Sequence, residues 1–191
     1  MRDECYSDGF VCQFAAEPSV YAPQLAQPEY AHNVCFVGNN IRDAETTERY
    51  ILAASKLGLV IYGNPSSWNN HLCRGKISVR DEAILYSSAK VCLNAHLIEH
   101  LSYGCINFRV FNVLSCGGFL ISDYSDVLAE ELPGAIVFSE GGDDLQKKVA
   151  HYLEHPEATI PYRMQGLKTV LEAHTFKIRM RELVNWLEEI I

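Results

Sequence analysis

The sequence of 191 residues has no apolar run close to the ~18 residues that a membrane-spanning helix requires. A signal peptide is also missing, because the opening residues Met1-Arg2-Asp3-Glu4 are charged and no apolar stretch follows them. We therefore expect a cytoplasmic protein without a membrane span.

Cysteines at metal-binding or redox spacing are absent as well. The seven cysteines are odd in number and scattered, and no Cys-x-x-Cys pair occurs among them. This pattern indicates neither a disulfide framework nor a zinc site. Cys35 and Cys92 lie within apolar runs, which predicts that they are small residues of the core.

An excess of positive charge is missing too. The formal net charge of −8 argues against a nucleic-acid polymer as partner, because binding to a phosphate backbone needs a basic surface. The sequence shows no Ser-His-Asp order, no metal-ligand spacing and no P-loop, so hydrolase and kinase functions have no support. We expect neither a metal nor a cofactor.

The strongest functional signal is the stretch from Asn107 to Asp123, which predicts a short buried helix, a glycine stop and a strand. Asn107 is a favourable N-cap, and Gly117 is able to adopt the left-handed conformation that ends many helices. The helix between them has one polar stripe, formed by Arg109, Asn112 and Ser115. Its N-terminus follows the loop 102–106, and we expect free N–H groups there that point at an anion.

Strand and helix patterns alternate along the rest of the chain. Apolar runs predict strands at 33–37, 59–62, 91–95, 118–122 and 135–138. Amphipathic segments predict helices at 43–57, 79–90, 126–132, 143–155 and through much of 162–191. This order predicts an α/β, Rossmann-like parallel sheet of about five or six strands with helices on both faces. Residues 1–32 are expected to form an extended segment that leads into a single domain at 33–191.

Ligands of such sheets bind at the carboxyl ends of the strands. The loops expected there are 38–40, 63–64, 94–104 and 123–124. They contribute Gly38, Asn39, Gly63, Asn94, His96 and Tyr103, which are residue types that allow close backbone approach, form hydrogen bonds to a ligand or stack on it.

Two readings stay open for several of these residues. Arg109 either contacts a diphosphate or forms a salt bridge, since an arginine on so apolar a helix needs a partner. Tyr103 either stacks on a base or sugar or anchors its loop by packing.

The final helix carries Leu183, Leu187 and Ile190 on one face, and we expect this face to pack on the domain or on an absent N-terminal half.

Five motifs in order resemble one known family, the group 1 glycosyltransferase domain of the CgeB spore-maturation type. They are Phe36-Val37-Gly38-Asn39, Ile61-Tyr62-Gly63, the run from Leu85 to Asn94, Arg109-Val110-Phe111 with Cys116-Gly117-Gly118-Phe119-Leu120, and His174-Thr175 with Arg179. The resemblance implies the C-terminal, nucleotide-sugar-binding half of a GT-B glycosyltransferase. Arg109 is the implied catalytic residue. The implied binding residues are Gly38, Asn39, Gly63, Asn94, His96, Tyr103, Asn107, Arg109, Asn112 and Ser115.

The chain departs from the family pattern at three places. Asn112 and Gly104 occupy positions where related glycosyltransferases have glutamates, of which the one at position 112 binds the donor ribose. Asn39 stands where many relatives have the first residue of a basic pair that holds the donor diphosphate. An amide is able to bond a ribose hydroxyl, but it carries no negative charge.

Two function hypotheses follow from the residues and the resemblance together. The first is the donor-binding domain of an enzyme that moves a sugar from a nucleotide diphosphate sugar to an acceptor, together with a missing N-terminal domain or a partner chain. The second is a non-catalytic module that keeps the fold and binds a nucleotide or a protein.

Overall fold

The computed structural model describes residues 9–68 and 70–190, with the side chain of Ile190 outside that description. Its centre is a parallel sheet of five strands in the order β2-β1-β3-β4-β5. The strands are β1 (Val34–Val37), β2 (Leu59–Tyr62), β3 (Val91–Asn94), β4 (Leu120–Asp123) and β5 (Val137–Ser139). The predicted sheet is thereby confirmed, including its parallel pairing.

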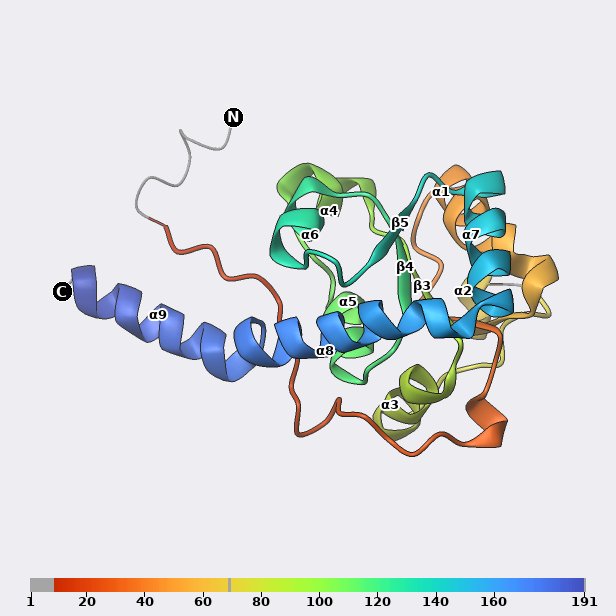
Figure 1. Ribbon diagram of the computed structural model, residues 1–191. Coiled ribbons are helices and arrows are strands. Elements are labelled where there is room, and N and C mark those ends of the chain that lie inside the picture. Colours follow the sequence, from red (N-terminus) through yellow and green to blue (C-terminus); the bar gives the residue numbers. More distant parts are fainter. Residues whose placement is uncertain (1–8, 69, 191) are drawn as a thin grey trace.

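Helices cover both faces of this sheet (Figure 1). The longer elements are α1 (Ala44–Tyr50), α3 (Val79–Ser88), α5 (Phe108–Ser115), α6 (Asp126–Glu131), α7 (Gly142–Glu154), α8 (Ile160–Ala173) and α9 (Phe176–Ile190). Short turns of helix complete the list: η1 (Pro28–Tyr30), η2 (Leu52–Leu57), α2 (Pro65–Trp68), α4 (Ile98–Tyr103) and η3 (Pro156–Thr159). None of the helices within the described ranges is long and apolar enough to cross a membrane.

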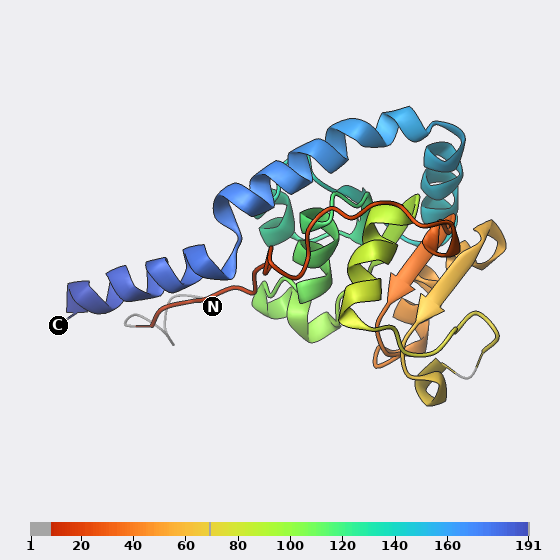
Figure 2. The same ribbon diagram turned by 90° about the horizontal axis from the view of Figure 1, so that it is seen from below.

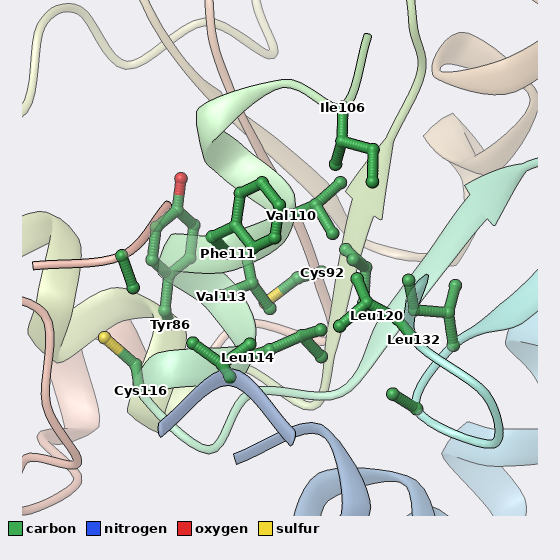
Figure 3. Close-up of a cluster of buried hydrophobic side chains, with 14 of the residues drawn as sticks. Tyr86, Cys92, Ile106, Val110, Phe111, Val113, Leu114, Cys116, Leu120 and Leu132 are labelled. Atoms are coloured by element: carbon green, nitrogen blue, oxygen red, sulfur yellow. The ribbon is translucent and has the colours of Figure 1, made fainter. Parts of the chain in front are cut away.

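Two hydrophobic clusters lie on opposite sides of the strands, because successive strand residues point to opposite faces. The first joins α3, α5, α6 and α8 to Cys35 and Cys92, and Figure 3 shows the side chains at its centre. The second joins η2 and α7 to the alternate strand residues, among them Phe36 and Leu93. Both cysteines are fully buried, as expected for small core residues.

Helix α5 ends as the sequence predicts. Gly117 has a φ of +67°. The N–H of Gly118 donates to the Val113 carbonyl at 2.9 Å, and that of Gly117 to Leu114 at 3.0 Å. This pair of bonds is a Schellman motif, which satisfies carbonyls that the helix itself leaves free.

The expected N-cap at Asn107 is right in position but wrong in mechanism. Asn107 has the extended conformation of an N-cap, yet its side chain makes no capping hydrogen bond. Its Nδ2 instead donates to Asn94 Oδ1 at 2.9 Å. The side chain therefore connects α5 to the end of β3.

Two further predictions about elements need correction. The expected helix 43–57 is split at Ile51, where the backbone leaves the helical region and continues as the 3-10 helix η2. Ile51 and Ala54 are both fully buried there, and a 3-10 turn brings residues three apart onto one side. The stretch 96–105, expected as a loop, contains α4, which ends at Gly104 with a φ of +64°.

The final helix α9 extends away from the body of the molecule (Figures 1 and 2). Leu183 is half-buried, whereas Leu187 is 39% exposed and Val184 51% exposed. Leu187 therefore does not pack closely on the domain, because the helix extends beyond it. The alternative, packing on an absent N-terminal half, stays a prediction. Ile190, the third residue of that face, lies outside the described side chains.

Candidate functional site

The strand order reverses its direction of growth between β1 and β3, which is the point where ligands bind in sheets of this topology. Arg109 spans this point from the first turn of α5. Its Nε donates to the carbonyl of Val37 at 2.5 Å, and its Nη1 donates to Asn94 Oδ1 at 2.7 Å. The guanidinium also stacks on Phe36, with 4.3 Å between its central carbon and the ring centroid. These contacts hold Arg109 over the ends of both strands.

Gly38 allows this close approach. A Cβ at position 38 would lie 2.5 Å from Arg109 Nη2, and the φ of +151° is one that other residues rarely adopt. Gly63 lies beside it for a different reason, since a Cβ there would collide with the Gly38 carbonyl. Of these two predicted site residues, Gly38 meets the arginine directly, and Gly63 permits tight packing of the two strand ends.

Arg42 is a second cation at this edge. Its Nε and Nη2 donate to the Ala95 carbonyl at 2.9 and 2.6 Å, and its Nη1 to the Asn39 carbonyl at 3.3 Å. Its guanidinium carbon lies 5.3 Å from the Phe36 ring centroid. Arg42 and Arg109 therefore both contact one aromatic ring and form a basic pair. The sequence had given no sign of this pair, because Asn39 stands where many relatives have a basic residue.

Both cations are held in a poorly hydrated environment. Desolvation lowers the pKa of Arg109, and the neighbouring acidic groups, Glu82 and Asp123 among them, oppose this effect. Desolvation and the positive charge of Arg109 lower the pKa of Arg42 to about 10. Among the ion pairs of the described residues, none includes either arginine. Two adjacent, unpaired and desolvated cations favour an anionic ligand.

A buried polar network lies beneath Arg109 at the ends of β3 and β4. Asp123 Oδ1 accepts from His96 Nδ1 and Asp123 Oδ2 from the His96 backbone N–H, both at 2.8 Å. Asn94 Nδ2 donates to Ser122 Oγ at 2.9 Å. Because Asn94 Oδ1 also accepts from Arg109, the network fixes the arginine. His96, expected to touch a ligand, is only 1% exposed and serves this network instead.

The charge of Asp123 is stabilised inside the protein. Burial acts to raise the pKa of this carboxyl, but hydrogen bonds from His96 and Ser122 lower it below the ordinary value of 3.8. Asp123 is thus ionised at neutral pH, although it is 3% exposed. Its negative charge lies close enough to favour the charged forms of Arg42 and Arg109.

The N-terminus of α5 opens toward the same place. Phe108 and Arg109 lie in its first turn, and their backbone N–H groups have no acceptor in the described part of the chain. The amides of the preceding loop are occupied, however. Gly104 and Cys105 donate to α4 carbonyls, and Ile106 donates to the Gln13 side chain. The expected free N–H groups therefore belong to the helix and not to its loop.

A cavity of about 460 Å³ adjoins Arg109. Its wall is formed by the end of β1, by α3 and α5, and by residues of the N-terminal segment and of α9: Glu17, Tyr21, Val37, Gly38, Glu82, Tyr86, Phe108, Arg109, Asn112 and Phe176. Its volume falls within the range typical of small-molecule sites. Glu82 was not singled out from the sequence, and Tyr86 entered there only as part of the run from Leu85 to Asn94.

The remaining predicted site residues lie elsewhere. Asn39 is exposed and its Oδ1 accepts from the Asn64 backbone N–H at 2.9 Å. Tyr103 is 83% exposed at the end of α4 and does not line the cavity. Ser115 is fully buried at the far end of α5, where its hydroxyl donates to the Tyr21 carbonyl at 2.5 Å. The structure thus brings Gly38, Asn94, Asn107, Arg109 and Asn112 together.

Side chains suited to metal binding do not gather in the described ranges. No group of three or more His, Cys, Asp or Glu residues lies there in an arrangement that holds a metal ion. The site offers hydrogen bonding and charge, supplied by two guanidinium groups, two helix N–H groups and the amide of Asn112.

Comparison with known proteins gives matches in sequence and in fold. The model of the family described as glycosyl transferase-like matches residues 42–185. Spore protein CgeB of Bacillus subtilis (strain 168) is 28% identical over 105 residues, which cover 48% of this chain and 31% of CgeB.

Several solved structures share the fold. A glycosyltransferase from Rickettsia africae ESF-5 has a TM-score of 0.72 at 12% identity and covers 95% of this chain and 57% of its own. Anabaena Alr3699/HepE in complex with UDP-glucose has a TM-score of 0.70 at 8% identity, with coverages of 92% and 56%.

The C-terminal domain of LpcC, a glycosyl transferase group 1 family protein from Francisella tularensis, matches over its whole length. It has a TM-score of 0.57 at 9% identity and covers 85% of this chain and 100% of its own. The present chain thus spans less than two thirds of CgeB and of the Rickettsia and Anabaena chains, but it spans all of an isolated C-terminal domain.

Proposed function

The chain belongs to the glycosyl transferase-like family, as its motifs suggested, and from this premise we propose that it is the donor-binding domain of a glycosyltransferase. In this proposal a sugar moves from a nucleotide diphosphate sugar to an acceptor, and the chain supplies the site for the nucleotide diphosphate. The acceptor is bound by another domain or chain across the cleft.

One observation carries the proposal: Arg42 and Arg109 flank Phe36 as two desolvated cations without an ion pair in the described residues. Holding two positive charges close together is unfavourable, and Asp123, the ionised carboxylate that favours both charged forms, is already bonded to His96 and Ser122. A diphosphate carries at least two negative charges and presents oxygens to several donors at once. It therefore matches the two guanidinium groups better than a single carboxylate does.

The N-terminus of α5 adds to this site. The free N–H groups of Phe108 and Arg109 lie at the positive end of the helix dipole, which favours bound anions. As the sugar leaves, negative charge accumulates on the departing diphosphate. Arg109 and the helix N-terminus would stabilise that charge, which is electrostatic catalysis by groups already in place. This is the catalytic role that we assign to Arg109.

A solved structure with a similar fold supports the proposal that the ligand is a nucleotide diphosphate sugar. Anabaena Alr3699/HepE was solved with UDP-glucose and with UDP, and its fold matches this chain over most of its length. We extend the ligand class, a nucleoside diphosphate sugar, to the present chain. Neither the base nor the sugar follows from this comparison.

Calorimetry with UDP, GDP, ADP and TDP tests the proposal. We expect one or more of them to bind the 191-residue chain in the micromolar to millimolar range. Arg109→Ala and Arg42→Ala should each weaken binding about tenfold or more, since each removes a charge-assisted contact. The matched control is Arg181→Ala, which removes an exposed arginine of α9 and should change nothing. Binding of none of the four, or binding insensitive to both site variants, rejects the donor site.

A second candidate function is a non-catalytic module of the same fold. Asn112 and Gly104, which replace the glutamates of related glycosyltransferases, favour it. The two candidates differ in one measurement, because only the first predicts sugar transfer once the acceptor-binding part is present.

A further inference from the structure

The cavity beside Arg109 is also lined by a carboxylate. This is Glu82 of α3, and both of its oxygens accept hydrogen bonds from tyrosines. Oε1 accepts from the Tyr86 hydroxyl at 2.6 Å, and Oε2 from the Tyr21 hydroxyl at 3.2 Å. The two tyrosines come from α3 and from the N-terminal segment, so the carboxylate is held in one orientation from two sides.

Glu82 keeps capacity for further donors. An ionised carboxylate has about four acceptor positions, and the two tyrosines occupy two of them. Burial, together with the nearby charge of Glu82, raises the pKa of both Tyr21 and Tyr86, so their hydroxyls stay protonated and act as donors. Among the ion pairs of residues 9–68 and 70–190, none involves Glu82.

The cavity therefore carries two chemically different kinds of group. Arg109, beside Gly38 at the tip of β1, is cationic, while Glu82 and Asn112 offer oxygens that accept hydrogen bonds. A ligand that suits both must carry an anionic group and, a short distance away, neutral hydroxyls that donate. A ribonucleoside diphosphate has this pattern, with its diphosphate at one end and the 2′- and 3′-hydroxyls of the ribose at the other.

We propose that Glu82 accepts hydrogen bonds from the ribose hydroxyls of the bound nucleotide and so selects ribonucleoside diphosphates over their 2′-deoxy forms. The inference rests on the proposed donor-site function and names its specificity residue. Carboxylates bind the ribose 2′-hydroxyl in the same way in dinucleotide-binding sheets. Glu82 supplies from α3 the negative charge that Asn112, on α5, does not have.

The preference for the ribose form over the 2′-deoxy form follows from the free energy that is lost when a covered acceptor has no donor. When the 2′-hydroxyl is absent, an oxygen of Glu82 loses a donor while the nucleotide still covers it. A site built to bond a hydroxyl therefore rejects the analogue without it more strongly than an apolar site does. The same argument disfavours a thymidine diphosphate sugar as the donor, since its sugar lacks the 2′-hydroxyl.

The test is calorimetry on the 191-residue chain with three matched pairs, UDP and 2′-deoxy-UDP, GDP and 2′-deoxy-GDP, and ADP and 2′-deoxy-ADP. We expect the ribose form of the preferred base to bind about tenfold or more tightly than its deoxy form. Glu82→Gln should weaken the ribose form about tenfold and leave the deoxy form within about twofold, so that the preference disappears. Glu154→Gln, an exposed change on α7, is the matched control and should keep it.

Other outcomes overturn the inference. It fails when the wild-type chain shows no preference, when Glu82→Gln leaves the preference unchanged, or when that variant weakens both forms equally. Nucleotide binding that needs Arg109 but ignores Glu82 rejects only this inference, whereas no binding of any nucleotide rejects the donor site as well. Glu82→Asp covers the case in which the glutamine variant is unstable by melting temperature. Aspartate keeps the negative charge on a side chain that is one methylene shorter. This variant should therefore reduce the preference for the ribose form severalfold.

Discussion

At the scale of single residues, Asp123 decides how the ends of β3 and β4 are held. Its two oxygens accept three hydrogen bonds, from the His96 backbone, the His96 ring and the Ser122 hydroxyl. The same network reaches Arg109 through Asn94. A buried carboxylate that is satisfied in this way stabilises the fold, but it leaves several unpaired groups when its charge is lost.

The pH dependence of stability tests this role. The pKa of Asp123 is lower in the folded chain than its ordinary value of 3.8, so its contribution is complete above that pH and is lost as the pH falls through the folded pKa. Asp123→Asn should reduce the free energy of unfolding at pH 7 by about 2–4 kcal/mol. The variant should also lose part of the decline in stability below about pH 4.

Urea denaturation at pH 7 and pH 3 measures both effects. Asp143→Asn changes an exposed aspartate in the first turn of α7 and serves as the control. A variant at position 123 that is as stable as the wild type at pH 7 would contradict the role given to this network.

At the scale of elements, α5 and α9 show opposite relations to the core. Six of the eight residues of α5 are buried, and its polar positions are therefore used for specific contacts. Helix α9 is anchored at its start, where Arg179 is 9% exposed and donates from Nη2 to His174 Nδ1 at 2.7 Å. Its later turns expose Val184 and Leu187.

This difference predicts tolerance in the last turns of α9. Replacing Val184 and Leu187 together with lysine should leave the melting temperature within a few degrees, because neither side chain is buried and surface changes rarely exceed ~0.5 kcal/mol. Val170→Lys in α8 is the contrasting variant, since Val170 is fully buried and an unpaired charge there should unfold the chain. Differential scanning calorimetry measures all three proteins. A large drop for the double variant would contradict the exposure of this face in the isolated chain.

At the scale of the whole molecule, the chain covers only part of most of the proteins that share its fold. It spans 57% of the Rickettsia glycosyltransferase and all of the LpcC C-terminal domain. Active sites of the GT-B type, as the resemblance implies, lie between two domains. One half alone leaves the diphosphate exposed to water and offers no acceptor contacts.

We therefore expect the 191-residue chain to bind a nucleoside diphosphate without transferring sugar. Release of free nucleoside diphosphate from UDP-glucose, GDP-mannose and ADP-glucose, followed over hours, measures turnover by hydrolysis or transfer. Boiled protein and the Arg109→Ala variant are the controls. Turnover by the isolated chain that Arg109→Ala abolishes would show that the active site is complete without a second domain.

Much of this architecture is already determined by the amino-acid sequence. Apolar runs separated by amphipathic segments specify a covered parallel sheet, because such strands are stable only when both faces are buried. The end of α5 is determined just as locally, since Gly117 adopts its left-handed conformation at little cost. Short-range rules were insufficient where tertiary packing decides, as at Ile51 and in the six-residue helix α4.

Only the tertiary structure decided which polar groups meet. Arg42 and Arg109 are 67 positions apart, yet both contact Phe36, and Glu82 lines the cavity although it precedes the motif that begins at Leu85. His96, expected at a ligand, turns inward to Asp123 instead. Sequence patterns report which face of an element is buried, but not which neighbour satisfies a polar side chain. That choice depends on the positions of other elements, because a buried charge or hydrogen-bonding group adopts the arrangement that the surrounding partners allow.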